Sequence, residues 1–126
     1  MLNASLLSIV EDAGVAVLTL TEGLEEDEFL ASRLTRAETA RQLRSMSDAA
    51  ANLPPQVHTL LAEVDWDGWQ TVAQQIDAGG AAEREALWFA VRSLVPATLM
   101  WLRVYRKSLP EIFECRPESD AWRGTP

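Results

Sequence analysis

The sequence predicts an all-α protein: an up-and-down bundle of four main helices with short additional helices. Apolar residues recur at steps of three and four along most of the chain, which is the spacing of one face of a helix. No segment alternates apolar and polar residues as a half-buried strand does. Residues that start or stop helices separate the periodic segments. This combination is typical of a helical bundle.

Length and composition predict one soluble domain. The chain has 126 residues, of which 48% are apolar and 24% charged, and this excludes a disordered chain. We expect one bundle over residues 1–113 and a C-terminal tail over 114–126. The 19 acidic and 11 basic residues give a net charge of −8, which argues against a main surface that binds bare phosphate backbone.

Several features favour the cytoplasm. No uninterrupted apolar run reaches ~18 residues, so we expect no transmembrane helix. The N-terminus has no basic stretch ahead of an apolar core, as a secretion signal would. Cys115 is the only cysteine and cannot form an intrachain disulfide.

The first helix is predicted over residues 4–21. Asn3 or Ser5 would cap its start, and Gly23 would follow its end. Gly14 marks either a close helix crossing or a neutral position. The inward stripe is expected to consist of Leu6, Ile9, Val10, Ala13, Val17 and Leu20.

The acidic segment that follows is interpreted as a solvated loop and the first turn of a short helix, where carboxylates suit the positive helix end. A metal site is the alternative, but no histidine lies at ligand spacing. The residues expected to anchor this short element to the core are Phe29, Leu30 and Leu34.

The second long helix is predicted from Arg36 to about Ala51. Thr35 and Glu38 form the pattern of a capping box, and Pro54-Pro55 would end the helix. Its inner face would be made of small residues and one leucine: Ala37, Ala40, Leu43, Ser47 and Ala50. Its outer arginines are interpreted as a solvated face, with an RNA-binding stripe as the alternative: Arg33, Arg36, Arg41 and Arg44.

Pro55 can open a short helix. His58, the only histidine, lies on it and is expected on the exposed side, without a catalytic partner. Asp67 would cap the next helix, which would start near Gly68, and Trp66 and Trp69 are interpreted as packing anchors rather than a binding site. This helix would run to Asp77 and end at Ala78-Gly79-Gly80, a turn without the lysine of a phosphate loop.

The last apolar stretch is predicted from Ala81 to Ser108. Leu87, Val91, Leu94, Leu99 and Leu102 have helical spacing, with Trp88 and Trp101 beside them. Pro96 must kink or divide the helix, because it lacks the N–H that the helical ladder needs. Leu109-Pro110 would close it.

The residues alone indicate no enzyme. The lone histidine has no evident partner for nucleophilic catalysis, and no Cys/His cluster indicates a metal. Cys115 is a weak nucleophile candidate. We therefore expect no metal, no cofactor, and a bundle that self-associates through apolar and tryptophan faces.

The order of motifs resembles the HepT-like family of the HEPN superfamily, which comprises small all-α proteins. The matching segments, over about residues 4–110, are Glu22-Gly23-Leu24 with Phe29, Leu34-Thr35-Arg36-Ala37-Glu38, Ala50-Ala51-Asn52-Leu53-Pro54, Asp65-Trp66-Asp67-Gly68-Trp69, and Leu87-Trp88 with Val91-Arg92 and Pro96. The resemblance implies a homodimer that cuts RNA without metal. In such a dimer a histidine is the base and an arginine stabilises the phosphate in the transition state.

The residues that carry this chemistry in the family are missing here. The family's Arg, polar, His and Tyr positions fall on Ala73, Gln74, Ala78 and Gly80, and residues 70–82 contain no Arg, His or Tyr. The missing tyrosine is the residue that the family's nucleotidyltransferase partner modifies with AMP. The sequence therefore predicts a HepT-like bundle without catalytic residues, acting as a dimeric scaffold in a toxin–antitoxin-like or nucleotidyltransferase-associated system.

The candidate binding or dimer-interface residues are Trp66, Trp69, Ile76, Trp88, Arg84 and Arg92. A first alternative is a metal-independent ribonuclease that recruits His58, Arg84 and Arg92 into a dimer groove. A second is a small-ligand binder with a closed apolar pocket lined by Trp66, Trp69 or Trp88. RNA binding is not favoured, and no membrane contact is expected.

Overall fold

Helices account for almost all of the chain that the structure describes. The structure is a computed structural model that describes residues 2–114; Cys115 and the rest of the predicted tail lie outside this range. No strand occurs within it, which confirms the predicted all-α class. The elements in chain order are α1 (Leu2–Thr21), α2 (Glu26–Ala31), α3 (Arg33–Asn52), α4 (Pro55–Leu60), α5 (Trp66–Ala78), α6 (Gly80–Phe89), the π-helical segment η1 (Ala90–Leu94), α7 (Val95–Ser108) and the short 3₁₀ helix η2 (Pro110–Phe113).

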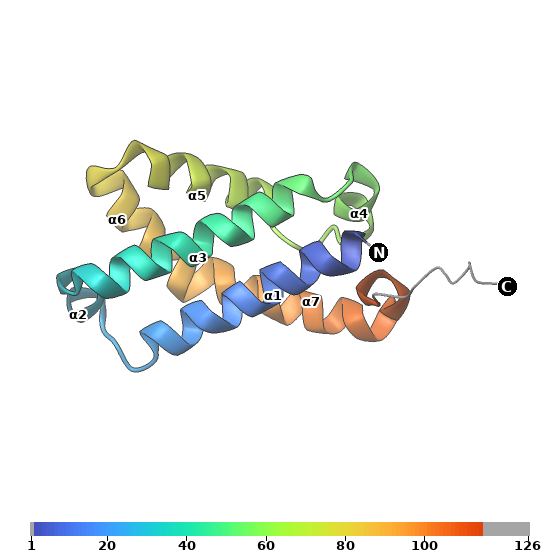
Figure 1. Cartoon of the computed structure of the whole chain (residues 1–126), viewed down its shortest axis with the longest axis horizontal. Helices are drawn as coiled ribbons and strands as arrows, with labels where there is room; N and C mark the ends of the chain where they lie inside the picture. The colour runs from blue at the N-terminus through green and yellow to red at the C-terminus, as the bar shows by residue number, and fades with distance from the viewer. Residues whose placement is uncertain (1, 115–126) are drawn as a thin grey trace, which may run out of the picture.

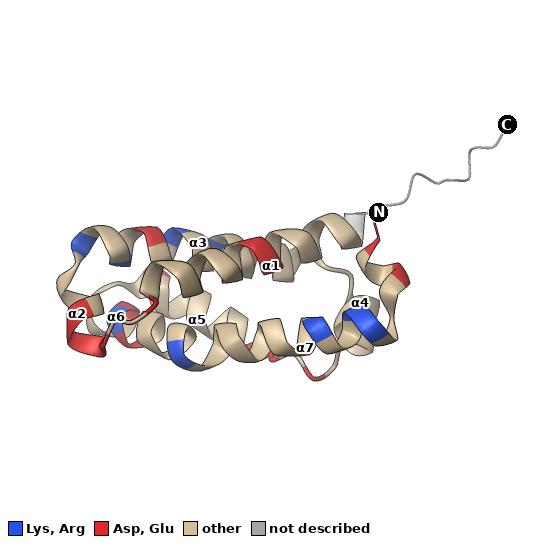
Figure 2. Cartoon of the chain, turned by 90° about the horizontal axis from the view of Figure 1, so that it is seen from below, with Lys and Arg blue, Asp and Glu red and all other residues tan. Residues whose placement is uncertain are grey.

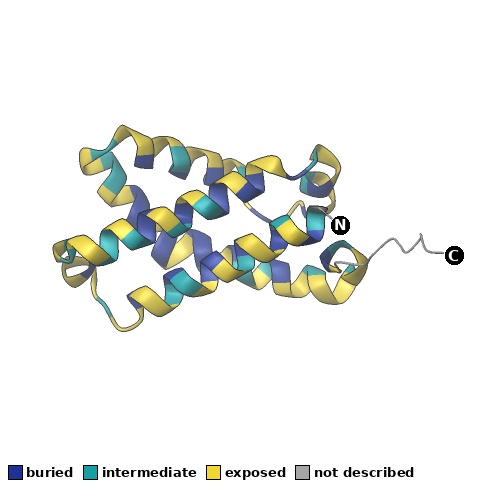
Figure 3. Ribbon diagram, viewed as in Figure 1, coloured by how far each residue is buried: buried dark blue, intermediate teal, exposed yellow. Residues whose placement is uncertain are grey.

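The long helices enclose a single apolar core. Helices α1 and α3 lie side by side, α5 packs against α3, and α7 packs against α1 (Figure 1). Each long helix turns a buried stripe toward the others and an exposed stripe outward (Figure 3). The most deeply buried large side chains therefore come from all five of the longer α-helices: Leu7, Leu43, Trp69, Leu87 and Leu102.

The predicted stripe of α1 is right at its centre and wrong near its ends. Ile9 and Leu20 are 42% and 37% exposed, whereas Leu7, which the prediction left out, is fully buried. The buried face is thus turned slightly around the helix from the predicted one. Because α1 already begins at Leu2, Asn3 and Ser5 lie within the helix and do not cap it.

Gly14 lies where α1 passes closest to its neighbours. A Cβ atom there would be 2.9 Å from Cδ2 of Leu99 in α7 and 3.1 Å from Cε of Met46 in α3. Both distances are shorter than ordinary van der Waals contact. The close-crossing interpretation of Gly14 is therefore correct.

The start of α3 differs from the prediction. Ser32 caps the helix, and its hydroxyl accepts a hydrogen bond from the Thr35 N–H at 3.3 Å. The predicted Thr35–Glu38 capping box is wrong, because Thr35 already lies inside the helix. Leu34 is 82% exposed and anchors nothing, and Ala37 is exposed too.

The ends of α5 are set by an aspartate and two glycines. Asp65, not Asp67, caps the helix, and its Oδ1 accepts from the Gly68 N–H at 2.9 Å. At the other end Gly79 and Gly80 adopt φ of 74° and 63°, in the left-handed region that favours glycine. The predicted turn therefore exists and leads directly into α6.

Pro96 is accommodated by a change of helix type. The π-helical segment η1 precedes α7, and the Val95 N–H donates to the Ala90 carbonyl five residues back. Pro96 follows in the first turn of α7, where proline is tolerated. The predicted interruption is therefore a π-bulge, and α6, η1 and α7 stay continuous.

Two helical segments are long and apolar enough to cross a membrane, judged by length and composition alone. They are Asn3–Thr21 and Gly80–Ser108, with mean hydropathies of 1.5 and 1.2. In the fold 44% and 39% of these windows are buried. Core helices of soluble proteins pass the same test, so this finding assigns no location.

Candidate functional site

A hollow of about 360 Å³ between α3, α4 and α5 brings together four of the residues that the sequence analysis singled out: His58, Trp66, Trp69 and Ala73. We call it the His58 hollow. Ser47 and Asp48 line it from α3, and His58 lines it from α4. Its wall from α5 consists of Trp66, Asp67, Trp69, Gln70 and Ala73. The volume lies in the lower part of the range typical of small-molecule pockets.

His58 is held by two contacts. The sequence predicts it on the exposed side of its helix, but in the structure it is half-buried. Its Nε2 lies 2.8 Å from the Ala50 carbonyl oxygen. Because a carbonyl only accepts, Nε2 must carry the proton, which leaves Nδ1 as the acceptor of the neutral ring. The ring stacks on Trp66 with centroids 4.6 Å apart and planes inclined by 26°. These two contacts fix its orientation.

The two tryptophans of α5 are fixed by hydrogen bonds of their indole N–H groups. Trp66 donates to the Leu61 carbonyl at 3.0 Å and is half-buried. Trp69 donates to the Thr98 hydroxyl of α7 at 2.9 Å and is 1% exposed. Both therefore help to hold α5 in place, and Trp66 is the more accessible of the two.

The charge around the His58 hollow is negative. Asp48 and Asp67 contribute exposed carboxylates, and no lysine or arginine lines the hollow. Within residues 2–114 no group of three or more His, Cys, Asp or Glu residues could hold a metal ion. The hollow offers an imidazole and an aromatic wall, with two carboxylates that favour a neutral or cationic molecule over a phosphate.

The positions to which the HepT-like resemblance assigns chemistry lie along α5 and its end. Ala73 lines the His58 hollow, and Gln74 and Ala78 are exposed. Gly80 is the first residue of α6. None of these side chains can transfer a proton.

The three residues of the ribonuclease alternative lie in three different hollows. His58 lines the one just described, Arg84 a hollow of about 190 Å³ between α3 and α6, and Arg92 one of about 280 Å³ near the end of α1. No lining residue is shared among the three. Within one chain the structure therefore does not bring the histidine and these arginines together.

The other candidate residues divide between core and surface. Ile76 is buried and packs in the core, like Trp69. Trp88 is half-buried, with its ring 5.5 Å from that of Phe29 and the Arg92 guanidinium 5.5 Å from its own ring centroid. Of the six candidates, the accessible ones are thus Trp66, Trp88, Arg84 and Arg92.

Sequence reasoning missed Ser47, Asp48 and Gln70 as neighbours of His58. Each lies on a helix that was predicted, but the angle between α3 and α5 decides which side chains meet. Comparison with known proteins adds no assignment: no protein family, no curated protein and no solved structure matches the chain.

Proposed function

We propose that this chain is a HepT-like four-helix bundle of the HEPN superfamily that works by binding and not by turnover. In this proposal it acts in the cytoplasm as a homodimeric scaffold, and a nucleotidyltransferase-like protein is its further partner. The sequence supports the loss of catalysis, because Ala73 and Ala78 stand where the family has its ionisable pair. Neither methyl group can accept a proton or offset the charge of a phosphate.

One observation carries the dimer: the continuous helix α6–η1–α7 exposes three large apolar side chains. Phe89, Met100 and Val104 are 49%, 43% and 42% exposed. Met100 and Val104 are four residues apart and share one side of α7. The opposite side of α7 packs into the core through Thr98 and Leu102. An apolar face of this kind is typical of an interaction surface.

Charge favours a second copy of the same chain on this face. Arg103 and Lys107 are exposed near the C-terminal end of α7, whereas Glu22 and Glu25 lie beside Trp88, ahead of the start of α7, in a hollow that Arg92 also lines. Figure 2 shows the basic end of α7 far from the acidic α2. A two-fold, antiparallel pairing would set the basic end of each chain opposite the acidic end of the other.

Sedimentation velocity tests the dimer. We expect the purified chain to sediment as a dimer at micromolar concentration and the Met100→Glu variant as a monomer, because two buried carboxylates would face each other across the axis. Leu34→Glu is the matched control, since Leu34 is 82% exposed on α3 and away from this face. A wild-type chain that stays monomeric at high concentration would refute the dimer.

An RNA cleavage assay tests the loss of catalysis separately. We expect no metal-independent cleavage even at stoichiometric protein, with Ala73→Ser as a sham control. Robust cleavage by the wild-type chain would overturn the binding function and favour the ribonuclease alternative.

Small-ligand binding is a second candidate, favoured by the aromatic wall and the volume of the His58 hollow. Binding there would change the fluorescence of Trp66, which is accessible and contacts His58. Ala73→Leu would fill the hollow and abolish a fluorescence change that arises from it. An unchanged response in that variant would place the ligand elsewhere.

A further inference from the structure

A second hollow is surrounded by arginines, although the chain as a whole is acidic. The hollow of about 190 Å³ lies between α3 and α6 and is lined by Arg33, Arg36, Ala37, Glu83, Arg84 and Leu87. We call it the arginine hollow. Figure 2 shows basic residues on the first turns of α3 and on α6, at the same end of the molecule. Segments about fifty residues apart in sequence thus bring three guanidinium groups around one small space.

These arginines have no ion-pair partner within the described part of the chain. The ion pairs there involve Arg41, Arg44 and Arg106. Glu83 is the one carboxylate that lines the hollow, and it makes no ion pair with the arginines. The Nε of Arg36 is buried and has no hydrogen-bond partner. A buried donor without a partner is unfavourable, so a ligand that accepts a hydrogen bond from it would bind favourably.

Two of the three acidic residues of the neighbouring α2 are occupied elsewhere. The Glu28 side chain accepts from the Glu25 N–H at 2.8 Å, and the Asp27 side chain accepts from the Glu28 N–H at 2.9 Å. Both carboxylates therefore serve the N-terminus of their own helix. They lower the local potential but do not bind the arginines.

The residues of the arginine hollow come from the first turns of two helices. Arg33, Arg36 and Ala37 belong to the first turns of α3, and Glu83 and Arg84 to the first turns of α6. The N-terminus of a helix carries a partial positive charge and favours anions, phosphate groups in particular. The planar guanidinium group matches the oxygens of a phosphate in geometry.

We propose that the arginine hollow binds a phosphate dianion, either free or as the end of a small phosphomonoester. Three guanidinium groups offer more N–H donors than a carboxylate can accept, but a phosphate group can accept from all three. The small volume fits one such group. Ala37 and Leu87 provide an apolar edge for the carbon chain of an ester. This site is separate from the α7 face and the His58 hollow, so it stands without the proposed dimer.

Isothermal titration calorimetry on the full chain, in phosphate-free buffer of low ionic strength, tests the proposal. The probes are inorganic phosphate and glycerol phosphate. We expect saturable binding of one phosphate per chain. Arg84→Gln and Arg33→Gln should each weaken it by about tenfold or more, because each removes charge-assisted hydrogen bonds. Both residues are exposed, so the variants should fold, which circular dichroism checks.

Two further variants set the direction of the effect. Glu83→Gln should tighten binding several-fold, because it removes the one carboxylate of the hollow. Arg44→Gln is the matched control, since Arg44 lies on α3, pairs with Asp77 at 3.6 Å and does not line the hollow. It should bind phosphate like the wild type.

The affinities for the two probes, compared between the variants, decide whether the hollow binds phosphate. Equal affinities for both probes would indicate a site for free phosphate, and tighter binding of glycerol phosphate would indicate a phosphomonoester; each supports the proposal. The absence of saturable heat with both probes would overturn it. An equal loss in Arg44→Gln and Arg84→Gln would also overturn it, because it would indicate attraction by overall charge and not by this hollow.

Discussion

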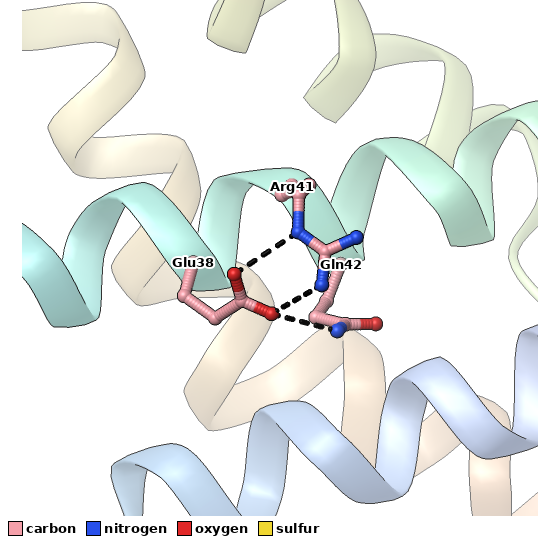
Figure 4. A network of polar contacts seen from close by, with 3 residues as sticks. All are labelled: Glu38, Arg41 and Gln42. Carbon is pink, nitrogen blue, oxygen red and sulfur yellow. Dashed lines mark hydrogen bonds and ion pairs between the residues drawn. The ribbon is translucent and has the colours of Figure 1, made fainter.

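Glu38 shows how a single half-buried carboxylate at the surface can couple the stability of this fold to pH. Its oxygens accept hydrogen bonds from Arg41 at 3.0 and 2.5 Å and from Gln42 at 2.9 Å (Figure 4). These bonds, the one from Arg41 first, lower the pKa of Glu38 from 4.5 to about 2. The pKa of Arg41 is raised in turn by the same hydrogen bond.

The sign of the pH effect follows from this shift. A carboxylate whose pKa is lower in the folded state stabilises the fold above its unfolded pKa and loses that contribution as the pH falls toward its folded pKa. The free energy of unfolding of the wild type should fall as the pH drops from 4.5 to about 2, and it should fall less in Glu38→Gln, which has no carboxylate to protonate. Urea denaturation at a series of pH values measures it. Because the pair lies at the surface, added salt should shrink the difference, and a parallel pH profile of both proteins would contradict the assignment.

Gly14 makes a second residue-scale prediction. Gly14→Val would push two methyl groups toward Leu99 and Met46, at a point where even a Cβ atom has too little room. We expect a loss of about 1–3 kcal/mol in the free energy of unfolding, the usual effect of overpacking a core. Ser8→Val is the control, because Ser8 is exposed on the same helix and receives the same β-branched side chain. Equal effects of both substitutions would show that helix propensity, and not the crossing, explains the loss.

At the scale of elements, the π-helical segment η1 explains how an interrupted sequence keeps a continuous helix. A π-bulge holds one residue more than the α-helical turn it replaces. Deleting one residue from it removes the bulge and leaves the faces of α6 and α7 in register. The same deletion in an α-helix turns everything beyond it by about 100°.

We therefore expect deletion of Ser93, which is exposed in η1, to destabilise the fold less than deletion of Arg103, which is exposed in α7. Removing the bulge also brings the Pro96 ring against the carbonyl four residues before it, so adding Pro96→Ala to the Ser93 deletion should recover stability. Thermal unfolding followed by circular dichroism compares the three variants. Deletion of Ser93 that unfolds the chain even with Pro96→Ala would contradict this account.

The elements also show what the sequence could predict. The periodic spacing and the prolines and glycines located every long helix, because these signals depend on a few neighbouring residues. The exact caps were wrong at Thr35 and Asp67, because Ser32 and Asp65 carry the same signal two or three residues earlier. Local sequence cannot decide between such neighbours, since the packing of the helix fixes where it starts.

The candidate sites needed the tertiary structure. His58 was evident as the only histidine, but its contacts with Ala50 and Trp66 depend on how α4 folds back. Arg33 and Arg36 were interpreted as a solvated helix face. Only the approach of α6 adds Arg84 and turns that face into a hollow. Periodicity shows which residues share a helix face and says nothing about which faces meet.

At the scale of the whole molecule, the distribution of charge is more informative than its sum. A net charge of −8 makes two copies of the chain repel each other at long range. Any attraction between oppositely charged ends of the two copies must therefore act at short range. In the proposed antiparallel dimer Arg103 of one chain faces Glu22 of the other. Both side chains are exposed, and within residues 2–114 neither makes an ion pair in its own chain.

A charge swap tests this arrangement. Arg103→Glu and Glu22→Arg should each weaken the dimer several-fold, because each places like charges opposite one another. In the mixed dimer of the two variants both symmetric contacts join opposite charges, one reversed and one as in the wild type, and in the double variant both contacts are reversed. The dissociation constant from sedimentation equilibrium should therefore be largest for each single variant alone, and near that of the wild type for both the equimolar mixture and the double variant. All differences should shrink at high salt.

The double variant could instead dimerise more weakly than either single variant, with the two losses in affinity adding. That result would leave the apolar face of α7 as an interface but exclude the antiparallel pairing, because only that pairing couples the two ends.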